Sequence, residues 1–507
     1  MKAAVRLSLA AFAFASLAGC GDGGPAPLDK ARADFATQDY QAARTSLFAA
    51  LEQEPGNREA LVLLARTQIA LGDAEAAERA IARLETAGEK GPRLKRLKAG
   101  LALLRGRASE VIALTVNDFD TEAWRLRAEA YLALGDDKAA ADAFARGMQA
   151  GDDLPLAVAY ARFALGGGDL SRVDHILSKM QKFAAKSYNT LVLAGDLASA
   201  RGETDRAIAA YRRTIAAYPD KVPPMLALAN AYDEQGKVDE AMAVLEKARK
   251  VAPGDPALED LRIQLLAEKG EWETIRLGLQ GRDGDLDPAS GVGLTYAEAL
   301  LRLGYAEQAR VLFSRAVLLD PGNAYARTML GEAQLATHDP RGAWATLKPL
   351  AAGTLARPEV LSLAERAARA SGDPQADALK ARLDPARLKA TMVLADKGLS
   401  ALARQDWAGA LAAYRELLRR GQDGEVLTNL AWASARSGEA KAALAYADSA
   451  LALNPDDPDY LHAAARVRLE LRSDLTGARR LLEAAASADP GNAEIARDLA
   501  KAKAAAA

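Results

Sequence analysis

Cysteine is almost absent from this chain of 507 residues, which contains only Cys20. A lone thiol has no partner within the chain for a disulfide. Histidine is also scarce, and the three histidines, His175, His338 and His462, lie far apart in the sequence. The sequence therefore offers no Cys/His nucleophile and no Cys/His metal cluster, and we expect no metal and no cofactor.

An excess of positive charge is missing as well. Lysine and arginine number 66 against 68 aspartates and glutamates, for a net charge of −2, and nucleic-acid binding needs clustered positive charge. Aromatic residues make up only 5% of the chain although hydrophobic residues reach 50%, with alanine as the main contributor. This composition favours closely packed helices with small side chains at their contacts. Beyond the N-terminus, no apolar run is long enough to span a bilayer.

Residues 1–19 have the three-part order of a secretory signal. Lys2 and Arg6 form a short basic region, and an uncharged apolar run of 11 residues, 7–17, follows. A membrane-spanning helix needs about 20 residues. The segment therefore predicts a signal that is cleaved and not a permanent span.

The end of this signal, Leu17, Ala18 and Gly19 followed by Cys20, resembles the lipobox of bacterial lipoproteins. The resemblance implies cleavage before the cysteine and lipids on Cys20; an ordinary signal with a chance cysteine is the alternative. Residues 20–30 then form a lipidated N-terminus and a flexible tether. Gly21 directly after the cysteine favours the outer membrane under the enterobacterial sorting rule. We expect a lipid-anchored, periplasm-facing protein of the bacterial envelope.

The remainder of the chain repeats with a period of 34 residues. Glycines recur at this interval from residue 168 to residue 304, and His338 takes the next position. In residues 222–255, apolar residues at helical spacing precede and follow Gly236. The pattern predicts helix, turn, helix and turn, in which each helix has one apolar stripe that only stacking can bury. Histidine tolerates the left-handed turn conformation, so we assign His338 a structural role.

These units resemble the tetratricopeptide repeat. The first helix carries a large residue, a small residue and an aromatic, and the second helix carries an alanine where the two helices approach most closely. That alanine recurs at Ala43, Ala77, Ala140, Ala207, Ala241, Ala309, Ala343, Ala410, Ala443 and Ala478. The resemblance implies an all-α fold, a right-handed α-solenoid (superhelix) of about thirteen helix-turn-helix units.

Irregular stretches divide the predicted array. We expect an N-terminal array over residues 31–275, an irregular bend over 276–293 and a C-terminal array over 294–490. Residues 491–507 are expected to form a polar capping helix and tail, because the end of a solenoid has no neighbour to cover it. The repeats leave no room for a catalytic domain, so we expect no enzyme.

In this family the first helices line a concave groove, and the residue after the small position points into it. These positions are polar or aromatic in nearly every unit. The candidate groove residues are Asp196, Asn230, Asp233, Glu298, Glu332 and Trp432. They predict a groove for an extended, partly basic protein or peptide ligand; a merely solvated face is the alternative. Trp432 is either an aromatic anchor for the ligand or half-buried between units.

A narrower resemblance concerns the pathway. The lipobox, the tether and the segment "LVLAGDLASARGETDRAIAAYRRTIAAYPD" are similar to the tetratricopeptide lipoproteins of exosortase and PEP-CTERM loci. That likeness implies a lipid-anchored scaffold for protein–protein interactions in exopolysaccharide production or export, or in surface-protein sorting. The alternative is an outer-membrane assembly factor, of the pilus pilotin or β-barrel assembly type.

Overall fold

The computed structural model describes residues 26–282 and 284–505, and these residues form 29 helices and no strand. The predicted signal, the lipobox and Cys20 lie outside the described residues. The helices pair into fourteen hairpins, one more than the sequence indicated, and α29 follows the last pair. In the α21–α22 hairpin the second helix, α22, has only 7 residues, so this hairpin does not show the regular 34-residue spacing.

The chain divides into two compact units between Pro253 and Gly254. The first unit contains seven hairpins: α1 (Pro27–Ala36), α2 (Tyr40–Gln53), α3 (Arg58–Ala70), α4 (Ala74–Thr86), α5 (Pro92–Leu104), α6 (Ala108–Thr115), α7 (Thr121–Ala133), α8 (Asp137–Ala150), α9 (Leu154–Gly166), α10 (Leu170–Phe183), α11 (Tyr188–Ala200), α12 (Thr204–Ala217), α13 (Val222–Asp233) and α14 (Val238–Val251).

The second unit contains seven more hairpins and the final helix: α15 (Pro256–Glu268), α16 (Trp272–Leu279), α17 (Gly291–Arg302), α18 (Ala306–Leu319), α19 (Ala324–Ala336), α20 (Pro340–Ala352), α21 (Pro358–Ser371), α22 (Ala376–Arg382), α23 (Pro385–Ala403), α24 (Trp407–Arg420), α25 (Gly424–Arg436), α26 (Ala440–Leu453), α27 (Pro458–Glu470), α28 (Leu475–Ala488) and α29 (Ala493–Ala505).

Three of these bounds bear on the expected segments. Residues 27–30, which the sequence assigned to the tether, are the first turn of α1, because Pro27 fixes a helical φ at the first position of that helix. Helix α16 ends at Leu279 and α17 begins at Gly291, inside the expected bend. The division between the two units falls before this bend, between α14 and α15.

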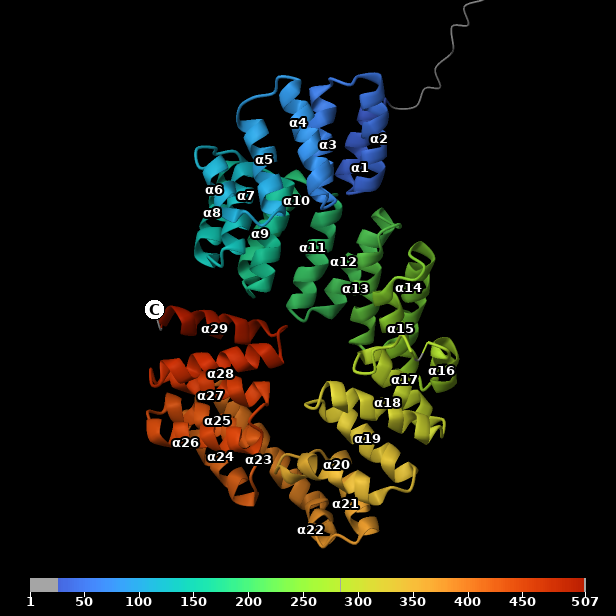
Figure 1. The fold of residues 1–507 in the computed structure, drawn as a ribbon, viewed down its shortest axis with the longest axis vertical. Coiled ribbons are helices and arrows are strands. Elements are labelled where there is room, and N and C mark those ends of the chain that lie inside the picture. The colour runs from blue at the N-terminus through green and yellow to red at the C-terminus, as the bar shows by residue number, and fades with distance from the viewer. Residues whose placement is uncertain (1–25, 283, 506–507) are drawn as a thin grey trace, which may run out of the picture. The chain divides into compact units, whose positions relative to one another are not determined.

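Within each unit, helices stack in chain order, as Figure 1 shows for the blue-to-green and the yellow-to-red parts. Each first helix packs on the second helix of its hairpin, and many also pack on the first helix of the next hairpin, as α5 does on α7 and α17 on α19. Where they pack in this way, consecutive first helices form a layer on one side of the hairpins. Side chains that point out of this layer lie close enough to interact from hairpin to hairpin.

The turn inside a hairpin is set by two residues. Gly72 has φ +78° and ends α3, and Asp73 then accepts a hydrogen bond of 2.9 Å from the Ala76 amide at the start of α4. His338, in the same slot of a later repeat, has φ +61°. The sequence predicted a left-handed conformation for His338, and the structure confirms it, although histidine carries a Cβ.

The hairpin core is built from small residues. The second-helix alanine is fully buried in all ten repeats where the sequence places it: Ala43, Ala77, Ala140, Ala207, Ala241, Ala309, Ala343, Ala410, Ala443 and Ala478 are each 0% exposed. Glycines on the first helices likewise allow the two helices of a hairpin to approach closely. A Cβ at Gly331 would lie 2.5 Å from Cγ of Leu347, and one at Gly195 would overlap the ring of Tyr211.

Candidate functional site

The predicted groove residues all belong to first helices. Asp196 lies on α11, Asn230 and Asp233 on α13, Glu298 on α17, Glu332 on α19 and Trp432 on α25. Asn230 is exposed, and the other five are partly buried. Because the first two helices belong to one unit and the last three to the other, the residues form a separate set on each unit.

In the second unit, Glu298 and Glu332 are held by one arginine. Arg302, at the end of α17, places Nη2 3.0 Å from Glu298 Oε1 and Nη1 3.1 Å from Glu332 Oε1. The hydroxyl of Tyr325 donates to Glu298 Oε2 at 2.5 Å. Burial and the hydrogen bond to Glu298 raise the pKa of Tyr325, so the phenol stays protonated as a donor at neutral pH. The two carboxylates thus join α17 to α19.

This arrangement changes the interpretation of Glu298 and Glu332. The sequence predicted that Glu298 and Glu332 attract a basic ligand. In the structure the guanidinium of Arg302 neutralises part of their charge and occupies acceptor oxygens of both. A basic ligand would have to displace Arg302, which lowers the gain from binding there.

In the first unit, Asp196 is likewise engaged from within. The hydroxyl of Tyr211, on α12, donates to Asp196 Oδ1 at 2.9 Å. Burial raises the pKa of Asp196, against the opposing effects of the Tyr211 hydrogen bond and the positive charge of Arg162. Burial together with the charge of Asp196 raises the pKa of Tyr211. Asp196 therefore ties the first helix of its hairpin to the second.

Other ion pairs join first helices of the first unit. Arg66 on α3 lies 2.7 Å from Glu122 on α7, and Arg96 on the intervening α5 lies 3.3 Å from the same carboxylate. Arg96 also pairs with Asp118 at 2.9 Å. The polar residues of this layer thus connect hairpins to one another, a role that residue type and spacing along the chain did not reveal.

Trp432 has different surroundings. Its side chain lines a cavity of about 520 Å³ formed by α25, α27, the turn after α27 and α29. The remaining lining residues are Arg466, Leu469, Glu470, Arg472, Glu494, Arg497, Asp498 and Lys501. The guanidinium of Arg466 lies over the indole, 4.5 Å from the ring centroid, in cation–π geometry. Of the six predicted groove residues, Trp432 is the one that lines this cavity.

The acidic side chains around Trp432 have partners within the chain. Glu470 pairs with Arg436 at 2.5 Å, and Asp498 accepts from Lys501 at 2.8 Å and bonds to His462 Nε2 at 2.9 Å. These two bonds lower the pKa of Asp498, although burial acts in the opposite direction. Asp498 therefore fixes α29 against α27 and is not an open acceptor.

Sequence reasoning missed the basic residues of this cavity. Arg472 follows Gly438 by one period of 34 residues and stands in the slot of the turn glycine. It has φ +49°, so an arginine adopts the left-handed conformation here. A residue other than glycine in the turn slot could have drawn attention to Arg472. Sequence reasoning considered such a residue only at His338.

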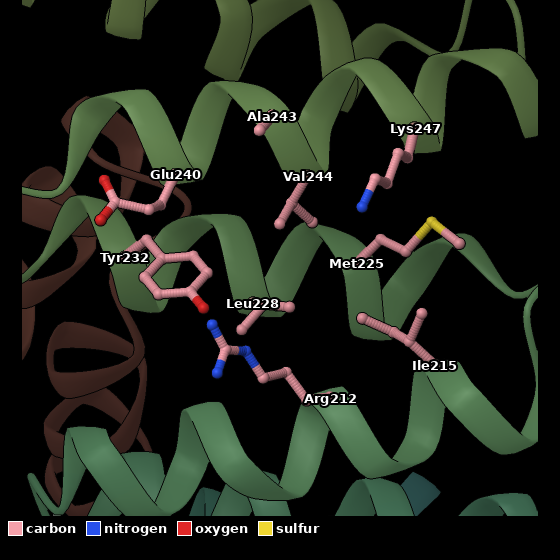
Figure 2. A pocket seen from close by; sticks show the side chains of 9 residues that line it. All are labelled: Arg212, Ile215, Met225, Leu228, Tyr232, Glu240, Ala243, Val244 and Lys247. Atoms are coloured by element: carbon pink, nitrogen blue, oxygen red, sulfur yellow. The ribbon is translucent and has the colours of Figure 1, made fainter.

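A second, apolar cavity lies in the first unit and is shown in Figure 2. It measures about 300 Å³ and opens between the second helices α12 and α14, with α13 as its floor. The lining residues are Arg212, Ile215, Met225, Leu228, Tyr232, Glu240, Ala243, Val244 and Lys247. Arg212 lies 5.5 Å from the ring centroid of Tyr232. The space accommodates an additional apolar side chain, and no predicted site residue lines it.

Two features are absent from the described residues, 26–282 and 284–505. No group of three or more His, Cys, Asp and Glu side chains has an arrangement suited to a metal ion. Among the helices in these ranges, none combines the length and apolarity that a membrane crossing requires.

The fold and the layer of first helices define a class, the all-α solenoids of tetratricopeptide repeats. One tetratricopeptide-repeat model matches residues 34–101 and 198–265, and a second matches residues 395–458. The chain therefore carries tetratricopeptide repeats in both units, as the sequence predicted. Proteins of this kind act generally as scaffolds that bind other proteins.

Among individual proteins, the chain is similar to Protein CTR9 homolog of Arabidopsis thaliana, with 29% identity over 154 residues. That match spans 30% of this chain and only 11% of the relative. Two solved structures also resemble it. The APC/C hetero-tetramer Cut9–Hcn1 has a TM-score of 0.38 and 17% identity, covering 93% of this chain and 95% of that chain. The P58(IPK) TPR domain has a TM-score of 0.21 and 13% identity, covering 94% and 97%.

Proposed function

We propose that this chain is a non-enzymatic, lipid-anchored scaffold that holds protein segments on its first-helix layer in the bacterial envelope. The single observation that carries the binding role is the Trp432 cavity, because the indole there is only partly buried and faces open space on that layer. Aromatic side chains in such positions supply much of the affinity of protein interfaces.

The anchor is proposed from the sequence alone. A signal of residues 1–19 that ends in Leu17, Ala18 and Gly19 before Cys20 supports lipidation of that cysteine. Gly21 supports the outer membrane as the destination. The likeness to lipoproteins of exosortase loci supports a place in exopolysaccharide production or export, or in surface-protein sorting.

Replacement of the anchor tests the localisation. Cells that carry Cys20→Ser should contain the protein in the soluble fraction, while the wild-type protein sediments with membranes and is released by detergent. The variant is expected to keep its α-helical circular dichroism, because the described helices begin at Pro27, after Cys20. A Cys20→Ser protein that stays with membranes would show that this cysteine is not the anchor.

Loss of the indole tests the binding role. Full-length wild type, Trp432→Ala and the control Trp407→Ala should be used to capture partners from envelope extracts. Trp407 is also partly buried and lies beside Arg436, 5.5 Å from its guanidinium, but it does not line the cavity. We expect the captured set to be lost with Trp432→Ala and kept with Trp407→Ala. An identical set from all three proteins would reject the cavity as the binding surface.

A further inference from the structure

The cavity around Trp432 carries an imbalance of charge. Four of its lining residues are basic, Arg466, Arg472, Arg497 and Lys501, and three are acidic, Glu470, Glu494 and Asp498. Lys501 pairs with Asp498, and Glu470 is neutralised by Arg436 from outside the lining set. The unbalanced part of the cavity is therefore basic.

Two of these arginines have no counter-charge. Within residues 26–282 and 284–505, no ion pair or hydrogen bond engages the side chain of Arg472 or of Arg497. Both residues are exposed, and they reach the cavity from different elements, the α27–α28 turn and α29. An anion in the cavity would therefore find two guanidinium groups available.

Arg472 stands in the turn slot of its hairpin in a left-handed conformation, as His338 and Gln405 do in theirs. Its φ of +49° lies in the left-handed region, where a Cβ costs free energy and where the preceding hairpin has Gly438 at φ +80°. The turn accounts for this conformation, so its strain bears on stability and gives the test of Arg472 a second, independent readout. Here the strained residue is one of the two arginines without a counter-charge.

We infer that the Trp432 cavity binds an acidic protein segment, with carboxylates on Arg472 and Arg497 and an apolar or aromatic side chain against the indole. The inference rests on the proposed scaffold function and names the chemistry of its ligand. The cavity volume of about 520 Å³ suits a few side chains. The carboxylate of Glu494 also lines the cavity and would repel the dense charge of a nucleic acid, so a peptide with spaced carboxylates fits better.

The test uses the full chain and a fluorescently labelled short peptide in which glutamate alternates with phenylalanine. The matched probe has glutamine in place of every glutamate, and each peptide is made with a free and with an amidated C-terminus. We expect the glutamate peptide to bind with an affinity that falls as salt is raised, and the glutamine peptide to bind at least about tenfold more weakly, since a charge-assisted hydrogen bond contributes about 1.5–3 kcal/mol. If amidation alone abolishes binding, the carboxylate that the cavity takes is the chain terminus.

The decisive variant is Arg472→Gly. It removes the guanidinium and also relieves the left-handed strain, so peptide affinity should fall about tenfold while the urea midpoint rises. Gln405→Gly is the matched control, because Gln405 has φ +58° in the α23–α24 turn and does not line the cavity. It should raise the midpoint and leave affinity unchanged. A merely structural arginine would change stability and not affinity.

Two outcomes overturn the inference. One is equal binding of the glutamate and glutamine peptides, and the other is an Arg472→Gly protein with wild-type affinity. If neither peptide binds although partner capture depends on Trp432, the carboxylate chemistry is wrong while the scaffold function stands. If capture is independent of Trp432 as well, both fail.

Discussion

The substitution Ala241→Leu tests how the repeats store their stability. Ala241 is 0% exposed in the second-helix alanine position of α14, which packs on α13, and Leu245 and Ala248 of the same helix are also at 0%. Leucine adds three carbon atoms at this position. The apolar cavity of the first unit is lined by Glu240, Ala243, Val244 and Lys247 of α14, and Ala241 is not among its lining residues.

The added atoms at Ala241 therefore do not open into that cavity. They must push α13 and α14 apart, which costs about 1–3 kcal/mol in well-packed cores, and we expect the upper part of that range. A local loss of this size lowers hydrogen-exchange protection about five- to 150-fold in the affected helices. Each hairpin packs mainly on its neighbours, so the loss should be confined to residues 188–251, the helices α11–α14.

The matched control is Ala243→Leu, the same substitution two residues further along α14. Ala243 is exposed and lines the cavity of about 300 Å³ in Figure 2, so a leucine can extend into that space. We expect a change within about 0.5 kcal/mol, as for an ordinary surface substitution. Hydrogen exchange with mass spectrometry resolves both variants helix by helix. Equal loss of protection in every helix of both units would refute the local account, and equal effects of the two variants would refute the packing argument.

Three further predictions follow from single contacts. Asp196→Asn should stabilise the protein at pH 7. The pKa of Asp196 is raised in the folded state, so the wild type loses stability as pH rises from the unfolded pKa of about 3.9 through the folded pKa. Asparagine has no such cost and still accepts the hydrogen bond from Tyr211. The gain in urea unfolding should shrink toward about pH 4, and a gain that is the same at every pH would contradict the assignment. Gly331→Ala should destabilise the protein by about 1–3 kcal/mol, because the new Cβ would lie 2.5 Å from the buried Leu347. The control Gly278→Ala in α16 meets no atom within 4 Å and should not destabilise. Similar shifts of the melting temperature for both variants would argue against the close approach at Gly331. Arg302→Met should lower stability by no more than about 1 kcal/mol. It should also create binding of a lysine-rich peptide that the wild type does not bind, because Glu298 and Glu332 lose their shared partner. Absence of that binding would show that these two carboxylates do not attract a basic ligand.

The fold could be predicted because its signals are local and repeated. The buried alanines, the glycine turns and the left-handed His338 depend on residues within one hairpin, and these appear in the sequence at a fixed spacing. One hairpin that the repeat pattern did not indicate is α21–α22. Its second helix has 7 residues, which is too short to display a helical period.

The candidate site could be predicted only in part. Trp432 was identified by its position after the small residue of the first helix, and it lines the cavity. The pairing of Glu332 with Arg302 was not identified, because it crosses from one hairpin to the next and depends on side-chain direction. Arg497 joins Trp432 only through the packing of α29 on α27, which no pattern within a single repeat encodes.

The position of the Trp432 cavity at the end of the stack has a consequence during synthesis. Contacts that reach mainly from one hairpin to the next have low contact order, so hairpins can fold in turn as the chain is made from its N-terminus. The cavity takes Arg497 and Lys501 from α29, the last helix. A chain interrupted before α29 would present folded repeats without this site, so the cavity is completed only when translation has passed α29.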